Sequence, residues 1–466
     1  MRLHRLDKVL ARRYARALFS LAIITLSIQM LAIPVAILLM LALSLARVHV
    51  VISLLLASLA GGLLAGMDLA QTMAAFNKGM SNGASVALSY ALLGAFAVAI
   101  AKSGLPHALA EQAVRQLQRG SAQQRLKWLL ILLLAVVSVM SQNVVPIHIA
   151  FIPLLLPPLL YVMARLQLDR RLVACVITFG LVTPYMLFPV GFGEIFLQQI
   201  LLGNISKAGM DVSSVNVMHA MAIPAAGMLA GLLLAVFVSY RQPRHYDVGR
   251  IQNVERTHAK IRPGALWIAA AAIAAAFAVQ LYSDSMLLGA LVGFLLFLAS
   301  GVVRWQEADA LFGEGMKMMA MIGFIMIAAQ GFAEVLQASG QIGPLVAASA
   351  DLFGHSRAAA AFVMLLVGLL VTMGIGSSFS TVPILTAIYV PLCMQLGFSP
   401  LATVAIIGTA GALGDAGSPA SDSTLGPTSG LNVDGQHDHM RDTVIPTFLH
   451  YNLPLLAAGW LAALVL

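Results

Sequence analysis

Two aspartates, Asp415 and Asp422, occur in a polar stretch that separates two apolar runs. The stretch from Gly408 to Gly430 reads GTAGALGDAGSPASDSTLGPTSG. A carboxylate at membrane depth costs about 2.5–3.5 kcal/mol on insertion scales, so it usually faces a cavity and has a function. Because a carboxylate can hold a proton and a monovalent cation in turn, we expect Asp415, with Asp422 as a second candidate, to couple the two. The alternative is that the stretch reaches the surface and both acids are solvated.

Glycines and a proline indicate that the backbone is unwound around Asp415. Gly411, Gly414 and Gly417 permit the unwinding, and Pro419 prevents the helix from re-forming. The ends of an interrupted helix offer free carbonyl groups, which favour cations, and free N–H groups, which favour anions. The stretch is therefore expected to supply ligands as well as charge.

The composition identifies the elements that must hold these groups. Of 466 residues, 60% are hydrophobic and only 10% are charged, whereas soluble domains are near one quarter charged. Apolar runs of about 18 residues or more recur along the whole chain, which predicts an all-α polytopic membrane protein with about 10–12 transmembrane segments. The net charge of +8 is better explained by basic cytoplasmic loops than by nucleic-acid binding.

An internal repeat divides the chain into two halves. Phe76, Gly79 and Met80 recur as Phe312, Gly315 and Met316, and FA and SG pairs follow in both halves at the same offset of 236 residues. Pro146 is expected to correspond to Pro383. We interpret 30–240 and 264–466 as two membrane repeats, 241–263 as a cytoplasmic linker and 1–29 as a basic N-terminal extension. Weak internal symmetry of this kind is typical of secondary transporters.

Loop charges indicate that the repeats are inverted. The loops 102–127 and 164–171 are basic, whereas the matching segments 339–357 and 396–400 carry one arginine and no basic residue, respectively. The positive-inside rule then assigns the first pair to the cytoplasm and the second to the outside. The apolar segment between each pair must return to its starting side, which predicts re-entrant hairpins with SQNVVP and GIGSSFSTVP at their tips. Two ordinary crossings joined by a polar turn are the alternative.

Each half also contains an interrupted helix. TPYMLFPVGFG interrupts the run 172–201, and the stretch around Asp415 interrupts the run that begins at Leu401. Glu194 and Asp422 follow at similar distances and are expected at near-symmetric positions as proton-coupling acids. Glu194 could equally be a first-turn acid that the helix dipole satisfies. Asp415 has no acidic counterpart, because TPYM occupies the matching region.

Two other segments leave alternatives open. NVDGQHDHMRD, at 432–442, could bind a metal through histidines and carboxylates, but its spacing matches no strong zinc pattern, and a solvated or gating loop is preferred. The extension 1–29 carries six basic residues on the side that the loop charges assign to the outside. Either 14–30 forms an extra crossing, or the extension lies on the cytoplasmic surface, or translation begins at Met30.

Several stretches together resemble a bacterial sodium/proton antiporter family related to NhaC-type carriers, within the ion-transporter superfamily. They are SQNVVPIHIAFIPLLLPPLL, RLVACVITFG, GDAGSPASDSTLGPTSGLNVDGQHDH and DTVIPTFLHYNLPL. Some members of that family are also labelled amino-acid transporter-related. The resemblance begins near Met30. It implies a central site that, with Thr183 of the first break, comprises Ser141, Gln142, Asn143, Ser377, Ser378, Ser380, Thr381, Asp415, Ser418, Ser421 and Asp422.

The expected function is secondary active transport by alternating access. In the antiport version, Na⁺ binds between hairpin tips and helix breaks, and Asp415 or Asp422 loses a proton as it binds. The alternative is a Na⁺- or H⁺-coupled amino-acid carrier. No cofactor, enzyme activity or metal other than Na⁺ is expected. The expected location is the bacterial inner membrane, the partners are the bilayer and the transported ion or small amino acid, and a homodimer is the assembly to test.

Overall fold

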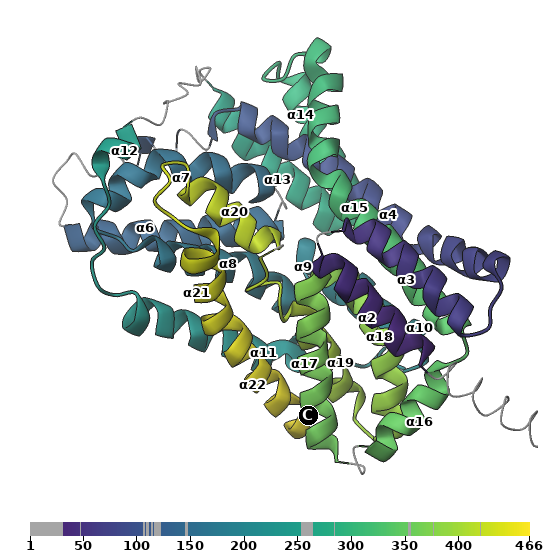
Figure 1. Ribbon diagram of the computed structural model, residues 1–466. Helices are drawn as coiled ribbons and strands as arrows, with labels where there is room; N and C mark the ends of the chain where they lie inside the picture. The colour runs from purple at the N-terminus through teal and green to yellow at the C-terminus, as the bar shows by residue number, and fades with distance from the viewer. Residues whose placement is uncertain are drawn as a thin grey trace, which may run out of the picture.

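The computed structural model describes the chain from residue 31 to residue 466 with several gaps. The described ranges are 31–46, 48–105, 108, 111–112, 115, 123–144, 148–252, 264–283, 285–352, 356–375, 377–419 and 421–466. The extension 1–29, Pro146 and residues 253–263 of the expected linker lie outside them. Within these ranges every regular element is a helix (Figure 1).

The first repeat contains twelve helical elements in the described ranges. They are α2 (Ala32–Leu45), α3 (Val50–Leu64), α4 (Leu69–Lys102), α6 (Gln123–Val139), the π-helix η1 (Met140–Val144), α7 (His148–Arg165), α8 (Arg170–Leu187), α9 (Phe192–Glu194), the π-helix η2 (Ile195–Leu202), α10 (Gly203–Lys207), α11 (Val217–Leu234) and the π-helix η3 (Ala235–Ser239). A short helix, α12 (Val248–Gln252), lies in the linker.

The second repeat follows the same order. Its elements are α13 (Ala265–Ser283), α14 (Met286–Ala299), the 3₁₀ turn η4 (Trp305–Glu307), α15 (Ala308–Ala338), α16 (Ile342–Leu352), α17 (Arg357–Ile375), α18 (Ser378–Gln395), α19 (Pro400–Ala412), α20 (Asp422–Leu431), the π-helix η5 (His439–Val444), α21 (Ile445–Thr447), the π-helix η6 (Phe448–Asn452) and α22 (Leu453–Val465).

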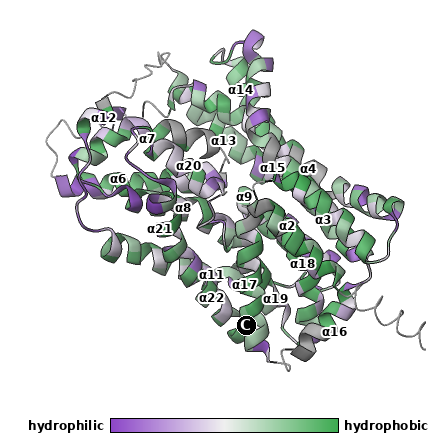
Figure 2. Ribbon diagram, viewed as in Figure 1, coloured by the Kyte–Doolittle hydropathy of each residue, from purple (hydrophilic) through white to green (hydrophobic). Residues whose placement is uncertain are grey.

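The helices have the length and composition of membrane spans. In the described part of the chain, six helical spans are at least 18 residues long and, by length and composition, apolar enough to cross a bilayer: 123–143, 170–187, 217–239, 265–283, 378–395 and 439–465. Shorter apolar helices accompany them, and hydrophobic residues dominate nearly every helix in Figure 2. Helices satisfy their own backbone hydrogen bonds, which is why such sequences adopt them in lipid.

The longest helices of the two repeats, α4 and α15, pack side by side and run antiparallel. A Cβ on Gly79 would lie 2.4 Å from the carbonyl oxygen of Gln330, and a Cβ on Gly315 would lie 2.1 Å from the amide nitrogen of Ala95. Gly79 and Gly315 correspond at the offset of 236, so one close contact occurs twice with the partners exchanged. Corresponding helices that run in opposite directions confirm the predicted inversion of the repeats.

Further along the chain the offset between the repeats is 230 rather than 236. The α7–α8 turn has Gln167 at φ 51° and Asp169 as the N-cap of α8, and the α18–α19 turn has Gly397 at φ 72° and Ser399 as the N-cap of α19. At this offset Pro383 corresponds to Pro153 in α7. The expected correspondence of Pro146 with Pro383 was therefore wrong, because the first repeat is six residues longer between the end of α4 and the start of α7.

Both repeats contain the predicted interruptions. Repeat 1 has α6, η1 and α7 as hairpin elements and a break between α8 and α9; repeat 2 has α17 and α18 as hairpin helices and a break between α19 and α20. The last α-helical N–H of α19 is that of Leu413, which donates to Thr409 O at 2.8 Å, and Gly414 follows at φ 85°. Glycine adopts this left-handed conformation without steric cost, so it ends the helix at this point.

Candidate functional site

Asp415 is buried, and three hydroxyl groups from three different elements surround its carboxylate. Ser378, at the start of α18, donates to Oδ2 at 2.8 Å. Tyr185 of α8 also donates to Oδ2, and Ser421, the N-cap of α20, donates to Oδ1. The Tyr185 and Ser378 oxygens lie 2.6 Å apart. Elements of both repeats therefore meet at one acid.

No basic side chain balances this acid in the described part of the chain. None of the ion pairs there includes Asp415. A buried carboxylate without a counter-charge is costly, because it loses hydration that neutral hydroxyls replace only in part. The arrangement thus suits a proton or a bound cation as the compensating charge.

Sequence reasoning did not select Tyr185, although it pointed to its segment. At the offset of 230, Tyr185 is the position that corresponds to Asp415, so the pseudo-symmetric partner of the acid is a phenol that donates to it. The signal was available in the pairing of TPYM with the Asp415 region. Because a tyrosine in an apolar helix is ordinarily a core residue, its type alone gave no reason to choose it.

An aromatic cluster covers Asp415 on the side of Tyr185. The Tyr185 ring centroid lies 5.0 Å from that of Phe196 and 5.8 Å from that of Phe192, both from the repeat 1 break and the helix after it. Phe379, beside Ser378, lies 4.4 Å from Phe192 by the same measure. The break of one repeat is thereby packed against the hairpin tip of the other, which keeps water from the acid.

The hairpin tip of repeat 1 lies against the break of its own repeat. Gly191, at φ 64°, is so close to Asn143 that a Cβ there would lie 1.6 Å from the Asn143 carbonyl oxygen. Gly180 contacts Ser138 in the same way. Both contacts advance along the chain in the same order, so α6 and α8 run in the same direction, and Thr183 lies at a level between the two contacts. Only glycine permits this approach at a positive φ.

The polar atoms at this tip are buried and mostly unpaired. Gln142 Oε1, Asn143 Oδ1 and Thr183 Oγ1 have no hydrogen-bond partner among the described residues, and nor has Gln280 Nε2, which lies 3.7 Å from the position that a Gly191 Cβ would occupy. Ser141 instead donates to Ser138 O at 3.1 Å. Unpaired buried polar groups are rare and call for a ligand or water. Gln280 was not predicted from the sequence.

The other predicted hydroxyls mostly bind backbone groups. Thr381 donates to Ser377 O at 2.9 Å, and Ser418 donates to Met373 O at 3.2 Å. Ser380 is fully buried, and its hydroxyl has no partner within the described residues. Ser380 and Thr381 lie on α18 with Ser378, and Ser418 lies three residues after Asp415 in the break.

Asp422 and Glu194 are near the site but not at corresponding positions. Asp422 is the first residue of α20 and is half-buried, whereas Glu194 is the third residue of α9. At the offset of 230, Asp422 corresponds to Phe192, so the expected symmetry of the two acids is displaced by two residues. Both acids lie in a first helical turn, where the helix dipole favours negative charge.

An ion-pair network joins the α7–α8 turn, the linker and the loop after α20. Arg170 forms a bidentate pair with Asp434 at 2.7 Å for both hydrogen bonds, and both side chains are 0% exposed. Arg244 of the linker bonds Asp442 at 2.8 Å. Burial works to raise the pKa of Asp434, but the bonds from Arg170 hold it below its usual value. Metal binding and a solvated or gating loop were the two interpretations of 432–442. Asp434 is instead buried and paired, so this part of the loop is not solvated and joins the second repeat to the first.

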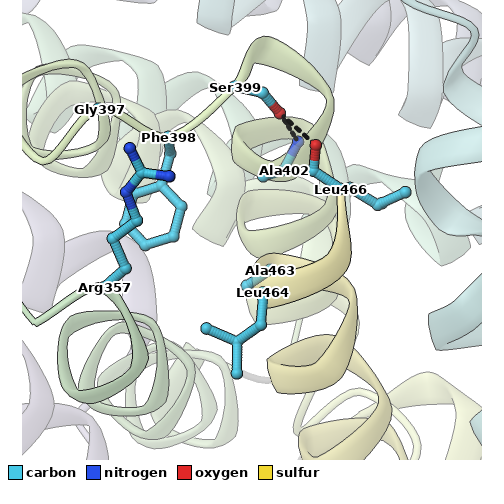
Figure 3. Close-up of a pocket in the computed structure, with 8 residues that line it drawn as sticks. All are labelled: Arg357, Gly397, Phe398, Ser399, Ala402, Ala463, Leu464 and Leu466. Atoms are coloured by element: carbon cyan, nitrogen blue, oxygen red, sulfur yellow. Dashed lines mark hydrogen bonds between the residues drawn. The ribbon is translucent and has the colours of Figure 1, made fainter.

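A cavity of about 270 Å³ lies away from Asp415, at the α18–α19 turn and the end of α22 (Figure 3). Arg357 and Phe398 line it together, and Ser399 donates to the backbone of Leu466 across it at 2.9 Å. Its lining residues include no acid, so it is not a candidate for proton coupling.

The chain matches family models over most of its length. Residues 176–460 match the model of the Na⁺/H⁺ antiporter family, and residues 31–117 match a second Na⁺-H⁺ antiporter family model. A Vibrio parahaemolyticus protein named Uncharacterized membrane protein VP2115 is 54% identical over 93% of this chain and 99% of its own. A Bacillus subtilis protein named "Putative amino acid transporter YuiF" is 52% identical over 93% of this chain and 100% of its own.

The fold is also that of a solved transporter. The structure of Neisseria gonorrhoeae MtrF, which is described as illuminating a class of antimetabolite efflux pumps, aligns with a TM-score of 0.53 and 18% identity over 85% of this chain and 83% of that one. Na⁺/H⁺ antiporters are transporters rather than enzymes and work without a cofactor. The protein is a multi-pass membrane protein and a secondary transporter, and its relatives are bacterial. The chain belongs to the Na⁺/H⁺ antiporter family.

Proposed function

We propose that this transporter exchanges Na⁺ for protons across the bacterial inner membrane, with Asp415 as the coupling carboxylate. One observation carries the proposal: Asp415 is buried among the hydroxyls of Tyr185, Ser378 and Ser421 without a basic partner in the described residues. Its charge must be balanced by a ligand that the protein does not supply. A proton and a Na⁺ ion can each do so, and one excludes the other.

Because a proton and Na⁺ compete for the Asp415 carboxylate, binding of one is coupled to release of the other. When Na⁺ binds, Asp415 is ionised and releases its proton; when Na⁺ leaves, the acid is protonated again. The three hydroxyls donate to the carboxylate in the described conformation, and each retains lone pairs that can bind a cation after rotation. Oxygen ligands of this kind suit a hard cation such as Na⁺.

The closed aromatic cluster supports alternating access. Tyr185, Phe192 and Phe379 pack together over the acid, so Na⁺ reaches it only after the repeat 1 break and the repeat 2 hairpin tip separate. The pseudo-symmetry of inverted repeats provides a second arrangement in which the opposite side opens. The buried Arg170–Asp434 pair belongs to the side that the loop charges assign to the cytoplasm.

Purified protein in liposomes tests the exchange. A Na⁺ gradient should drive a pH change that a trapped dye reports, and Asp415→Asn should abolish it while Asp309→Asn, an exposed acid on α15, leaves it intact. We expect Asp422→Asn to reduce the Na⁺-driven pH change as much as Asp415→Asn does, or less. A wild-type protein that moves no protons in response to Na⁺ would refute the proposal.

A coupled amino-acid carrier is the second candidate. The unpaired oxygens of Gln142, Asn143 and Thr183 would bind the ammonium group of such a solute, and the unpaired amide of Gln280 would bind its carboxylate. The name of the Bacillus subtilis relative also supports it. Uptake of labelled amino acids by the same liposomes, with and without Na⁺, distinguishes it from exchange of Na⁺ for protons.

A further inference from the structure

Two polar side chains of the C-terminal span reach the break that contains Asp415: His439, whose Nε2 lies 2.9 Å from Pro419 O, and Asn452, which lies beside Gly414. The span from His439 to Val465 includes two π-helical segments, and Asn452 is the last residue of the second one, η6. It is 0% exposed. π-helical segments within α-helices frequently occur at functional sites, because the extra residue turns a side chain toward a different face.

Asn452 binds a backbone group that the break releases. Its Oδ1 accepts the Gly414 N–H at 3.3 Å. In a continuous helix this N–H would donate to the carbonyl of Ala410, but that carbonyl accepts the hydroxyl of Thr372 at 3.1 Å instead. Two side chains from different helices thus replace the one hydrogen bond that the unwinding removes.

The same side chain also borders the far end of the unwound segment. A Cβ on Gly417 would lie 2.7 Å from Asn452 Nδ2 and 2.7 Å from Phe448 Cα. Nδ2 has no hydrogen-bond partner in the described residues. Asn452 therefore lies against Gly414 and Gly417, which flank Asp415 on both sides, and within the described residues its Nδ2 donates no hydrogen bond to the carboxylate.

We infer that Asn452 is a positioning residue that sets the conformation of the unwound segment and thereby the direction of the Asp415 carboxylate. Without its oxygen, the buried Gly414 N–H has no acceptor, and an unsatisfied buried donor drives the backbone to rearrange. The carboxylate would then no longer lie within reach of Tyr185, Ser378 and Ser421 together. The inference rests on the proposed role of Asp415 as the cation-binding acid.

Two variants separate the oxygen from the rest of the side chain. Asn452→Ala removes the acceptor oxygen. Asn452→Ser is close to alanine in size but carries a hydroxyl oxygen that can accept a hydrogen bond. Asn204→Ala is the matched control, because Asn204 is also buried but its amide donates to the carbonyl of Ile200, one turn earlier in η2, at 2.6 Å. All three are first checked for insertion and a monodisperse profile in detergent.

The first measurement is amide hydrogen exchange of residues 413–417, which is independent of transport. We expect exchange there to rise at least about tenfold in Asn452→Ala, to return partly in Asn452→Ser and to stay unchanged in Asn204→Ala. Unchanged exchange in Asn452→Ala, or an equal rise in Asn204→Ala, would overturn the inference. This result stands even if the wild-type protein does not exchange Na⁺ for protons.

The second measurement is the Na⁺ dependence of transport in liposomes. Asn452→Ala should raise the KM for Na⁺ about tenfold, which corresponds to about 1.4 kcal/mol, and should displace the pH profile, with partial recovery in Asn452→Ser. A purely structural role would lower the amount of active protein and leave KM and the pH profile unchanged. That outcome would also overturn the inference, whereas a wild-type protein without Na⁺-driven exchange would refute the proposed function alone.

Discussion

Replacing Asp434 with asparagine leaves the guanidinium of Arg170 buried without its counter-charge. The pair is bidentate, with hydrogen bonds of 2.7 Å, and both side chains are 0% exposed. Breaking a buried pair by removing one partner typically costs about 3–5 kcal/mol. Arg170 keeps its bond to Leu431 O at 3.0 Å and lies 4.2 Å from the ring centroid of Tyr246, so we expect the lower end, about 3 kcal/mol.

Thermal unfolding in detergent at one scan rate measures the effect. For a chain of this length, about 3 kcal/mol should lower the apparent Tm by roughly 3 °C. Arg170→Met should cost a similar amount, because it leaves the Asp434 carboxylate unpaired. The double variant Arg170→Met/Asp434→Leu should recover most of the loss, since an apolar pair carries no desolvation cost.

Asp247→Asn is the control, because Asp247 pairs with Arg250 at 3.6 Å while both side chains are about 60% exposed. An exposed pair contributes about 0–1 kcal/mol, so its Tm should hardly change. A Tm of Asp434→Asn equal to that of Asp247→Asn would refute the reasoning. A double variant that is no more stable than either single one would show that the loss arises from packing rather than from unpaired charge.

Three further predictions concern the site, the loop and the topology. Gly191→Ala should disrupt the repeat 1 tip and reduce transport at least about tenfold, because its Cβ would lie 1.6 Å from the Asn143 carbonyl oxygen. Gly209→Ala is the control and should retain transport, because nothing is found within 4 Å of its Cβ position. Equal transport activities of the two variants in liposomes would contradict this prediction. Burial lowers the pKa of His437 from 6.5 to about 4. The free energy of unfolding should therefore fall as the pH drops from about 6.5 to 4, because in this range only the unfolded chain binds the proton. The Tm measured across this range should fall less in His437→Gln than in the wild type, and parallel curves would exclude this histidine. Cysteines in 164–171 should react with impermeant reagents from the cytoplasm and those in 397–400 from outside, and labelling of both from one side would refute the proposed orientation.

The architecture could be predicted because a repeated motif and polar interruptions of apolar runs can both be read directly from the sequence. The shared Phe76 and Phe312 segments gave the offset that the antiparallel packing of α4 and α15 obeys, and the polar tips marked the interruptions. The hairpin in between was misaligned, with Pro146 matched to Pro383, because six residues are added to repeat 1 between α4 and α7. The matching turns at Gln167 and Gly397 fix the offset at 230 from there on.

The site was predicted in part, for physical reasons that differ among its residues. Ser421 is in the same stretch as Asp415, and Ser378 is at a hairpin tip, so their polar types in apolar surroundings were visible. Tyr185 and Asn452 contribute through contacts between distant segments, and a phenol or an amide in a membrane helix gives no local sign of its partner. The role of Asp415 as a coupling acid stays a prediction.

Two of the three arginines in the basic loop 164–171 are neutralised. Arg170 pairs with Asp434, and Arg171 pairs with Asp169 at 2.6 Å. The positive-inside rule counts basic residues during insertion, before such pairs form, so these arginines still assign the loop to the cytoplasm. Arg165, the third, lies at the end of α7 with no acid paired to it in the described residues.

Proton release on Na⁺ binding tests the central claim most directly. Purified protein in weakly buffered detergent solution is titrated with Na⁺ while a pH dye reports released protons, and Asp309→Asn serves as the control. We predict that the wild type and Asp309→Asn release protons that saturate with Na⁺, and that Asp415→Asn, correctly folded, releases none. Undiminished release from Asp415→Asn would contradict the account and transfer the coupling role to Asp422 or Glu194.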